Sequence, residues 1–324
     1  MIRTLETAGE RVALACALPW VSELIEEAAP TERKESGSGP ATLAVEVESS
    51  SRPFDTARWE PLTRGAWRLG HEVVIEDACS SGFDLRLHAV AEHPQFTFRW
   101  RPPLRGQAAA HLLRSRFILL ARSVLLQYPA MWRASLRGRA PLHASVCTAG
   151  NLHPLLAGPG GVGKSTLLTQ ELAAGGRAIG DNICVSDGTT AWGLVEPLRI
   201  EGGGGRSMPH GRAELPMPGR VLALAPDLVV VLRRGLDDVA QVRACSVETA
   251  ERSLITGTYM AGELRRFWGF AATLTAGTKL GPAHPQVERI GRIFASRLPA
   301  VEIVLPRQPG VRLAEVLSRV EAIA

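Results

Sequence analysis

Residues 158–165 read Gly-Pro-Gly-Gly-Val-Gly-Lys-Ser and fit the pattern G-x-x-x-x-G-K-[ST] without deviation. An apolar run at 153–157 precedes this loop, and a helical pattern follows it at 164–174. Glycines in such a strand–loop–helix unit let backbone N–H groups converge on phosphate oxygens, and the start of the helix adds the positive end of its dipole. The residues expected to bind nucleotide phosphate are Gly158, Gly160, Gly161, Val162, Gly163, Lys164, Ser165 and Thr166.

Lys164 is one of only three lysines in a chain that otherwise uses arginine for positive charge, the others being Lys34 and Lys279. A lysine at this position of the loop reaches the β- and γ-phosphates, and the hydroxyl of Ser165 is suited to hold Mg²⁺. Thr166 is expected to support the loop. The expected cofactors are therefore ATP, or another nucleoside triphosphate, and Mg²⁺.

The next candidate is Asp181, which follows an expected strand at 177–179, about one helix and one turn after Ser165. At the carboxyl edge of a strand beside the phosphate loop, an aspartate can take the proton of an incoming hydroxyl or hold the metal. The alternative is a turn aspartate that caps a hairpin beside Asn182.

Strands and helices alternate in the second half of the chain, which indicates an α/β fold. Its expected strands are 142–148, 153–157, 177–179, 183–186, 190–194, 228–233 and 300–305, and its expected helices are 164–174, 247–271, 285–297 and 313–322. The first half predicts a small, mostly antiparallel sheet from segments 42–47, 66–75, 83–90 and 95–100, after a helix-like stretch at 12–28.

A long amphipathic helix at 106–127, ended by Pro129, is expected to join the two halves. The expected domains are a β-rich domain at 1–104, the connecting helix at 105–137 and a phosphate-loop domain at 138–324. Substrate recognition is assigned to the first domain, because the core fold supplies only the nucleotide chemistry.

Composition argues against several classes of protein. Hydrophobic residues make up 45% of the chain, yet its longest apolar runs are interrupted by charge well before the ~20 residues of a membrane-spanning helix. The net charge is +5, but the arginines are dispersed among acids, which argues against nucleic acid as a partner. Five widely spaced cysteines without a CxxC pair indicate reduced core cysteines. Without a secretory signal at the start, a cytoplasmic location is expected.

Three segments together resemble a known family: His143-Ala-Ser ahead of the loop, GPGGVGKST at 158–166, and GGRAIGDN at 175–182. They are similar to the HPr kinase/phosphorylase family and its relatives, the HPr-kinase-like serine kinases. The resemblance is good from about 138 to 200 and extends to the carboxyl end only in layout. It implies a P-loop kinase domain of the HPr kinase/PEP carboxykinase-like type. Lys164 and Ser165 would then bind nucleotide phosphate and Mg²⁺, with Asp181 as general base.

The resemblance also implies roles for residues outside the loop. His143 stands where the family has a histidine near the site, and a buried structural histidine is the alternative. The family's second acid is Asn182 here, which implies a kinase without efficient reverse activity. The family's metal-linked glutamate corresponds to Glu201, at the start of a glycine-rich segment that ends at 206, and Glu196 competes with it. Among the arginines, Arg199 and Arg206 could neutralise the transferring phosphate, with surface charge as the default interpretation.

The expected function is therefore an ATP-dependent kinase that transfers the γ-phosphoryl group to a hydroxyl, such as a serine, of a peptide, small protein or amino-acid-like metabolite. A homo-oligomer is implied because HPr kinases form rings. One alternative is a P-loop ATPase, although the chain has no LSGGQ-like segment and its apolar strand at 228–232 runs into Arg233-Arg234 rather than acids. The other is a non-catalytic nucleotide-binding partner in a biosynthetic complex.

Overall fold

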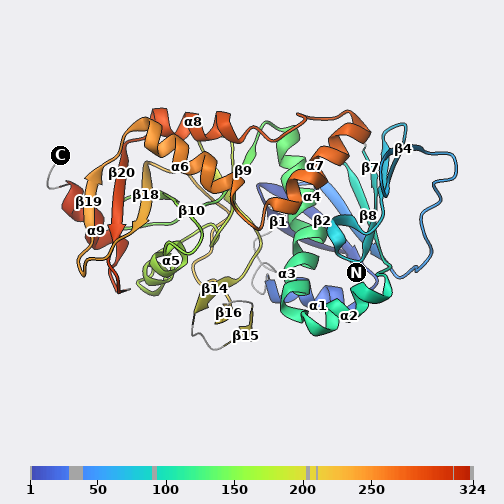
Figure 1. Ribbon diagram of the computed structural model, residues 1–324, viewed down its shortest axis with the longest axis horizontal. Coiled ribbons are helices and arrows are strands. Elements are labelled where there is room, and N and C mark those ends of the chain that lie inside the picture. The colour runs from blue at the N-terminus through green and yellow to red at the C-terminus, as the bar shows by residue number, and fades with distance from the viewer. Residues whose placement is uncertain are drawn as a thin grey trace. The chain divides into compact units, whose positions relative to one another are not determined.

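The computed structural model describes residues 2–28, 39–89, 93–201, 205–208, 211–308 and 310–321. The chain divides into two compact units. The N-terminal unit comprises Met1–Arg137, Ser207–Gly211 and Arg266–Pro285, and the C-terminal unit comprises Gly138–Arg206, Arg212–Arg265 and Gln286–Ala324. Both contain helices and sheets (Figure 1), so the expectation of a mixed α/β protein is confirmed.

An eight-stranded sheet forms the centre of the N-terminal unit, in the order β1-β2-β3-β8-β7-β6-β5-β4. Its strands are β1 (Ile2–Thr7), β2 (Glu10–Cys16), β3 (Leu43–Glu48), β4 (Glu60–Thr63), β5 (Ala66–Leu69), β6 (Glu72–Ile75), β7 (Phe83–His88) and β8 (Gln95–Trp100). The pairs β2–β3 and β3–β8 are parallel, and the others are antiparallel. The sheet is therefore larger and more mixed than the sequence predicted.

Two expected helices of this unit differ in the structure. The stretch at 12–28 is strand β2 followed by helix α1 (Pro19–Ala28), because burial alternates from residue to residue up to Ala15 and a proline then opens the helix. The helix expected to stop at Pro129 instead continues. It runs through α2 (Leu104–Leu112), α3 (Arg114–Arg122), a π turn (Ser123–Gln127) and α4 (Tyr128–Leu136). Pro129 is the second residue of α4, which directly follows the π turn, so the N–H that it lacks falls where the hydrogen-bond pattern of the helix changes.

A further helix of this unit is α7 (Arg265–Thr278), which belongs to it from Arg266 onward. Aromatic side chains fill much of the interior. Trp132 on α4 is fully buried and contacts Phe96 of β8 with ring centroids 5.8 Å apart, while Tyr128 lies 5.5 Å from Phe267 of α7. Helices α4 and α7 are therefore part of the core of this unit.

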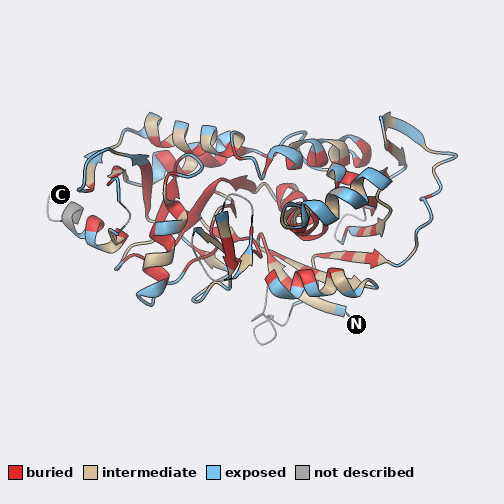
Figure 2. Ribbon diagram, turned by 60° about the horizontal axis from the view of Figure 1, so that its bottom comes forward, coloured by how far each residue is buried: buried red, intermediate tan, exposed pale blue. Residues whose placement is uncertain are grey.

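A five-stranded sheet organises the C-terminal unit, in the order β10-β11-β18-β20-β19. Its strands are β10 (Ala144–Val146), β11 (Pro154–Ala157), β18 (Leu228–Arg234), β19 (Gln241–Ala244) and β20 (Ala300–Leu305). The central pairs β11–β18 and β18–β20 are parallel, and both edges are antiparallel. β11 is wholly buried, as is β18 up to Leu232 (Figure 2).

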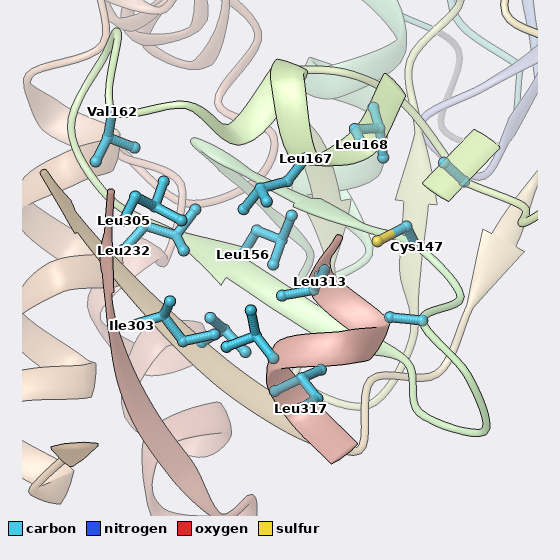
Figure 3. Packing of buried hydrophobic residues seen from close by; sticks show 14 of the residues in the cluster. Cys147, Leu156, Val162, Leu167, Leu168, Leu232, Ile303, Leu305, Leu313 and Leu317 are labelled. Carbon is cyan, nitrogen blue, oxygen red and sulfur yellow. The ribbon is translucent and has the colours of Figure 1, made fainter. Parts of the chain in front are cut away.

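Helices cover both faces of this sheet (Figure 1). On one face, leucines of α5 (Lys164–Ala173) and α9 (Leu313–Glu321) pack into a buried cluster with Leu156, Leu232 and Leu305 (Figure 3). Each leucine that is fully buried there stabilises the folded state by roughly 1.5–3 kcal/mol relative to an exposed one. Helices α6 (Val247–Tyr259) and α8 (Val287–Arg297) lie on the other side, where α6 contacts β11 and β18.

Two smaller sheets complete the unit. One has the order β17-β13-β12-β9, formed by β9 (Ala140–Leu142), β12 (Cys184–Ser186), β13 (Ala191–Gly193) and β17 (Ala223–Leu224). The other has the order β14-β16-β15, formed by β14 (Leu198–Glu201), β15 (Arg206–Ser207) and β16 (Arg212–Leu215). The expected hairpin is confirmed as β12 and β13, whose turn is held by Asp187 Oδ1, which accepts the N–H groups of Thr189 and Thr190.

Two other expectations for this unit are wrong. Helix 247–271 is interrupted, because α6 ends at Tyr259 and the chain turns through Gly262, a poor helix former, before α7 begins. Segment 177–179 is not a strand and does not adjoin β11. Ala178 forms isolated bridges to Cys147 and Arg220, and Ile179 N donates to Val146 O over 3.1 Å. Within the described residues, no helix is both long and apolar enough to cross a membrane.

Candidate functional site

The phosphate-loop sequence connects the end of β11 at Ala157 to the start of α5 at Lys164. Gly161 and Gly163 have φ of 77° and 121°, which side chains other than glycine rarely adopt. A β-carbon on Gly163 would also lie 3.0 Å from Leu305 Cδ1, whereas one on Gly160 or Gly161 would meet nothing within 4 Å. The loop is therefore packed against the sheet on one side and opens into free space on the other.

Lys164 lies inside this loop and is only 5% exposed. Its Nζ donates to Gly158 O over 2.9 Å and to Pro159 O over 3.2 Å. Burial lowers the pKa of Lys164 to about 8, although the negative charges of Asp181 and Glu263 work in the opposite direction. A buried ammonium next to an open glycine loop is well suited to bind an anion.

A cavity of about 1170 Å³ begins at the loop and lies entirely within the C-terminal unit. Among the residues that line it are Gly160, Gly161, Gly163, Lys164, Ser165 and Thr166 of the loop, together with His143 and Glu201. The charged side chains in its lining are Lys164, Arg199, Arg212, Arg233, Arg234, Arg252, Glu201 and Glu263. Positive charge is in excess, so the cavity favours a polyanion of the size of a nucleotide.

His143 is the single residue between β9 and β10, where the chain passes from one sheet to another. Its N–H donates to Thr258 Oγ1 of α6 over 3.0 Å, and its Nε2 is 2.9 Å from Asn182 Oδ1. Burial, followed by the charge of Lys164, lowers the pKa of His143 to about 4. The imidazole is therefore neutral at pH 7 and orients Asn182, which lines the cavity.

Asp181 is 1% exposed and does not line the cavity, whereas the next residue, Asn182, does. Its Oδ2 accepts the backbone N–H of Arg199 over 3.2 Å, and its Oδ1 has no hydrogen-bond partner among the described residues. The chain is fixed just before it, because Ser145 Oγ donates to Gly180 O. A β-carbon on Gly193 would be 1.7 Å from Ile179 O, so only glycine fits beside this segment.

A buried ion cluster adjoins Asp181. The side chain of Arg199 is 10% exposed and approaches Glu196 Oε2 at 3.4 Å and Glu263 Oε1 at 3.7 Å. Burial opposes the charge of Arg199, but Glu196, Asp181, Glu263 and Glu214 outweigh it, so its pKa is raised. The default interpretation of Arg199 as surface charge is wrong.

The pKa values of the two glutamates that contact Arg199 are shifted in opposite directions. Burial raises the pKa of Glu196 to about 7, even though the charge of Arg199 acts against this rise. Burial also opposes ionisation of Glu263, but Arg199 and its hydrogen bonds keep the pKa of Glu263 below its usual value. Glu263 is therefore ionised, and it lines the cavity.

Glu201 ends β14 and stands opposite Arg212 of β16, and both line the cavity. Residues 202–204 of the glycine-rich segment lie outside the described residues. In the described part of the chain, no group of three or more His, Cys, Asp or Glu side chains gathers closely enough to hold a metal ion. Any magnesium here would depend on hydroxyl and phosphate oxygens as well as carboxylates.

The structure thus brings His143, Lys164, Ser165 and Glu201 to one cavity, whereas Asp181 is buried and does not line it. Sequence reasoning missed Glu263 and Thr258, which come from the end of α6 and the turn after it. No motif marks either residue, since both are placed by the packing of α6 on the sheet. No protein-family model matches the chain, and a search of curated proteins finds no match either.

Proposed function

We propose that this protein is an ATP-dependent kinase that transfers the γ-phosphoryl group to a hydroxyl of a peptide, small protein or amino-acid-like metabolite, with serine as the expected acceptor. The observation that carries the proposal is the buried ammonium of Lys164 inside a glycine loop that opens into a cavity of about 1170 Å³. This combination suits a nucleoside triphosphate better than a neutral ligand. The resemblance to HPr kinases adds the direction of the reaction.

The reaction would be carried mainly by positioning and charge neutralisation. The acceptor oxygen forms a bond to the γ-phosphorus, the bond from that phosphorus to the ADP oxygen breaks, and the acceptor proton passes to a carboxylate. Asp181 is our candidate for that carboxylate, because its Oδ1 is buried and free of hydrogen bonds among the described residues. Glu263 is the competing candidate, because it faces the cavity.

Mg²⁺ fits the oxygen donors of this site, since Ser165 lines the cavity and Asp181 keeps an uncommitted carboxylate oxygen. Ser165 and Asp181 would hold it, with Glu201 as a further candidate. When bound with ATP, the ion would neutralise charge that develops on the phosphate oxygens. The residues themselves bind the phosphate, orient the acceptor and accept its proton.

An ATPase without an acceptor is less well supported. In P-loop ATPases an acidic residue of a neighbouring strand helps to hold the metal. Here β18, the parallel neighbour of β11, ends in Arg233 and Arg234 instead. Asn182 occupies the place of a second acid and cannot release a proton near neutral pH. We therefore propose transfer in the forward direction, without efficient dephosphorylation.

The test is a phosphoryl-transfer assay with γ-labelled ATP, Mg²⁺ and candidate peptides, proteins and hydroxy amino acids, read by mass spectrometry. Wild-type protein is compared with Asp181→Asn, Glu263→Gln and the exposed control Asp237→Asn. We expect Asp181→Asn to keep ATP binding and lose transfer, while the control transfers normally. Transfer at the wild-type rate by Asp181→Asn would reject the base assignment, and loss in Glu263→Gln alone would assign the role to Glu263.

The same assay separates the other functions. Label that appears only as free phosphate, independent of any acceptor, would identify an ATPase. Binding of ATP with no turnover in any mixture would favour a non-catalytic nucleotide-binding partner. Absence of ATP binding by the wild-type protein would reject the whole proposal.

A further inference from the structure

Arg234 ends the strand that runs beside the phosphate-loop strand. β11 and β18 are parallel and pair Ala157 with Val231, so Gly158 follows at the level of Leu232. A β-carbon on Gly158 would lie 3.0 Å from Leu232 O, which confirms how closely the loop begins against β18. Arg233 and Arg234 therefore leave the sheet at the edge where the loop opens.

The two arginines point to opposite faces of the sheet, because side chains alternate along a strand. Arg233 shares a face with Val231 and forms an ion pair with Glu302 of β20. Arg234 shares the face of Val230 and Leu232, which pack with α5 in the buried cluster. Arg234 is thus on the side of the sheet where α5 begins and the phosphate loop lies.

The side chain of Arg234 is close to the loop itself. Its Nη1 is 3.7 Å from the position that a β-carbon on Gly163 would take, and Gly163 immediately precedes Lys164. The backbone after it is fixed, since Gly235 N donates to Leu305 O over 2.8 Å. Yet the Arg234 side chain is exposed, lines the cavity, and forms no hydrogen bond or ion pair with another residue in the described part of the chain. Its charge is uncompensated next to a loop built for anions.

We infer that Arg234 binds the phosphate chain of the nucleotide, as a cation placed where other P-loop proteins carry an acidic residue. This inference rests on the proposed function, because it requires a nucleotide in the loop. The planar guanidinium can donate two parallel hydrogen bonds to phosphate oxygens, and glycine at position 163 leaves room for its approach. Together with Lys164, it holds the phosphates from two sides.

The experiment measures binding of ATP, ADP and AMP, each with Mg²⁺, by isothermal titration calorimetry. The variants are Arg234→Gln and the control Arg243→Gln, an exposed arginine of β19 that does not line the cavity. We expect Arg234→Gln to weaken ATP and ADP by about tenfold or more, the size of a lost charge-assisted hydrogen bond, and to affect AMP least. Arg243→Gln should stay within about twofold of wild type for all three nucleotides.

Two outcomes would overturn the inference while leaving the proposed function intact. In one, Arg234→Gln binds ATP as tightly as wild type. In the other, it loses ATP, ADP and AMP equally, which would place Arg234 away from the terminal phosphates. If the wild-type protein binds no ATP at all, the inference and the proposed function fall together. Thermal unfolding of the free variants checks that Arg234→Gln is folded.

Discussion

Two walls of the cavity carry charge in different ways. The carboxylate wall consists of Asp181, Glu196, Arg199 and Glu263, of which Arg199 and Glu263 line the cavity and the other two are buried. The arginine wall consists of Arg233, Arg234 and Arg252, which are exposed. Charges in the first wall are committed to one another, so they should govern stability. Charges in the second wall are available to a ligand, so they should govern binding.

The largest expected effect is a difference in stability between the same substitution, arginine to glutamine, made on each wall. Arg199→Gln leaves Glu196 and Glu263 without their shared cation, and loss of one partner from a buried ion pair costs about 3–5 kcal/mol of unfolding free energy. Arg234→Gln removes an exposed charge and should change stability by less than about 0.5 kcal/mol. Denaturant unfolding of both variants measures the difference.

A small loss in Arg199→Gln, comparable to that in Arg234→Gln, would break the comparison. Arg199→Lys is the matched control, since it keeps the charge and should recover part of the stability. Recovery is expected to be incomplete, because an ammonium cannot reproduce the planar contacts of a guanidinium with two carboxylates.

A second, smaller effect is the pH dependence of stability, because the pKa values of the buried residues Glu196 and His143 are shifted in opposite directions. The pKa of Glu196 is raised from 4.5 to about 7, so its contribution to stability is present below pH 4.5 and is lost as the pH rises towards 7. The pKa of His143 is lowered from 6.5 to about 4, so its contribution is present above pH 6.5 and is lost as the pH falls towards 4. Between pH 4.5 and 6.5, Glu196 makes the unfolding free energy fall with rising pH, whereas His143 makes it rise.

Single substitutions should separate these slopes. Compared with wild type, Glu196→Gln should gain stability as the pH rises from 4.5 to 6.5, and His143→Gln should lose it, each by at most about 1.4 kcal/mol per pH unit. Denaturant unfolding at several pH values gives both slopes. Parallel plots of unfolding free energy against pH for the two variants would show that burial does not control the protonation of Glu196 and His143.

The strand, loop and helix at 153–174 were predicted from the sequence because their requirements are local. Backbone angles at Gly161 and Gly163, the lysine and the following helix all follow from consecutive residues. The inner strands of the central sheet were also predicted, since short apolar runs such as 228–232 fill a two-sided core, whereas the edge strand β19 was missed. The mixed α/β class followed from their alternation with helices.

The carboxylate wall could not be predicted in the same way. Arg199 looked like surface charge because nothing local reveals that Glu196, Glu214 and Glu263 converge on it from three segments. Glu263 lies in a turn that the sequence assigned to the interior of a helix. Segment 177–179 looked like a strand, but its partner is β10 rather than the loop strand. Long-range packing decided each of these.

The smallest expected effect tests the arginine wall itself. Arg233 pairs with Glu302, and their side chains are 58% and 14% exposed. Because water competes for Arg233, a double-mutant cycle with Arg233→Gln and Glu302→Gln should give a coupling energy below about 1 kcal/mol, which added salt reduces further. A coupling above about 2 kcal/mol, insensitive to salt, would mean that this wall is held as firmly as the carboxylate wall. Arg234 would then stand beside a structural ion pair, and the contrast between committed and available charge would hold only for Arg234 and Arg252.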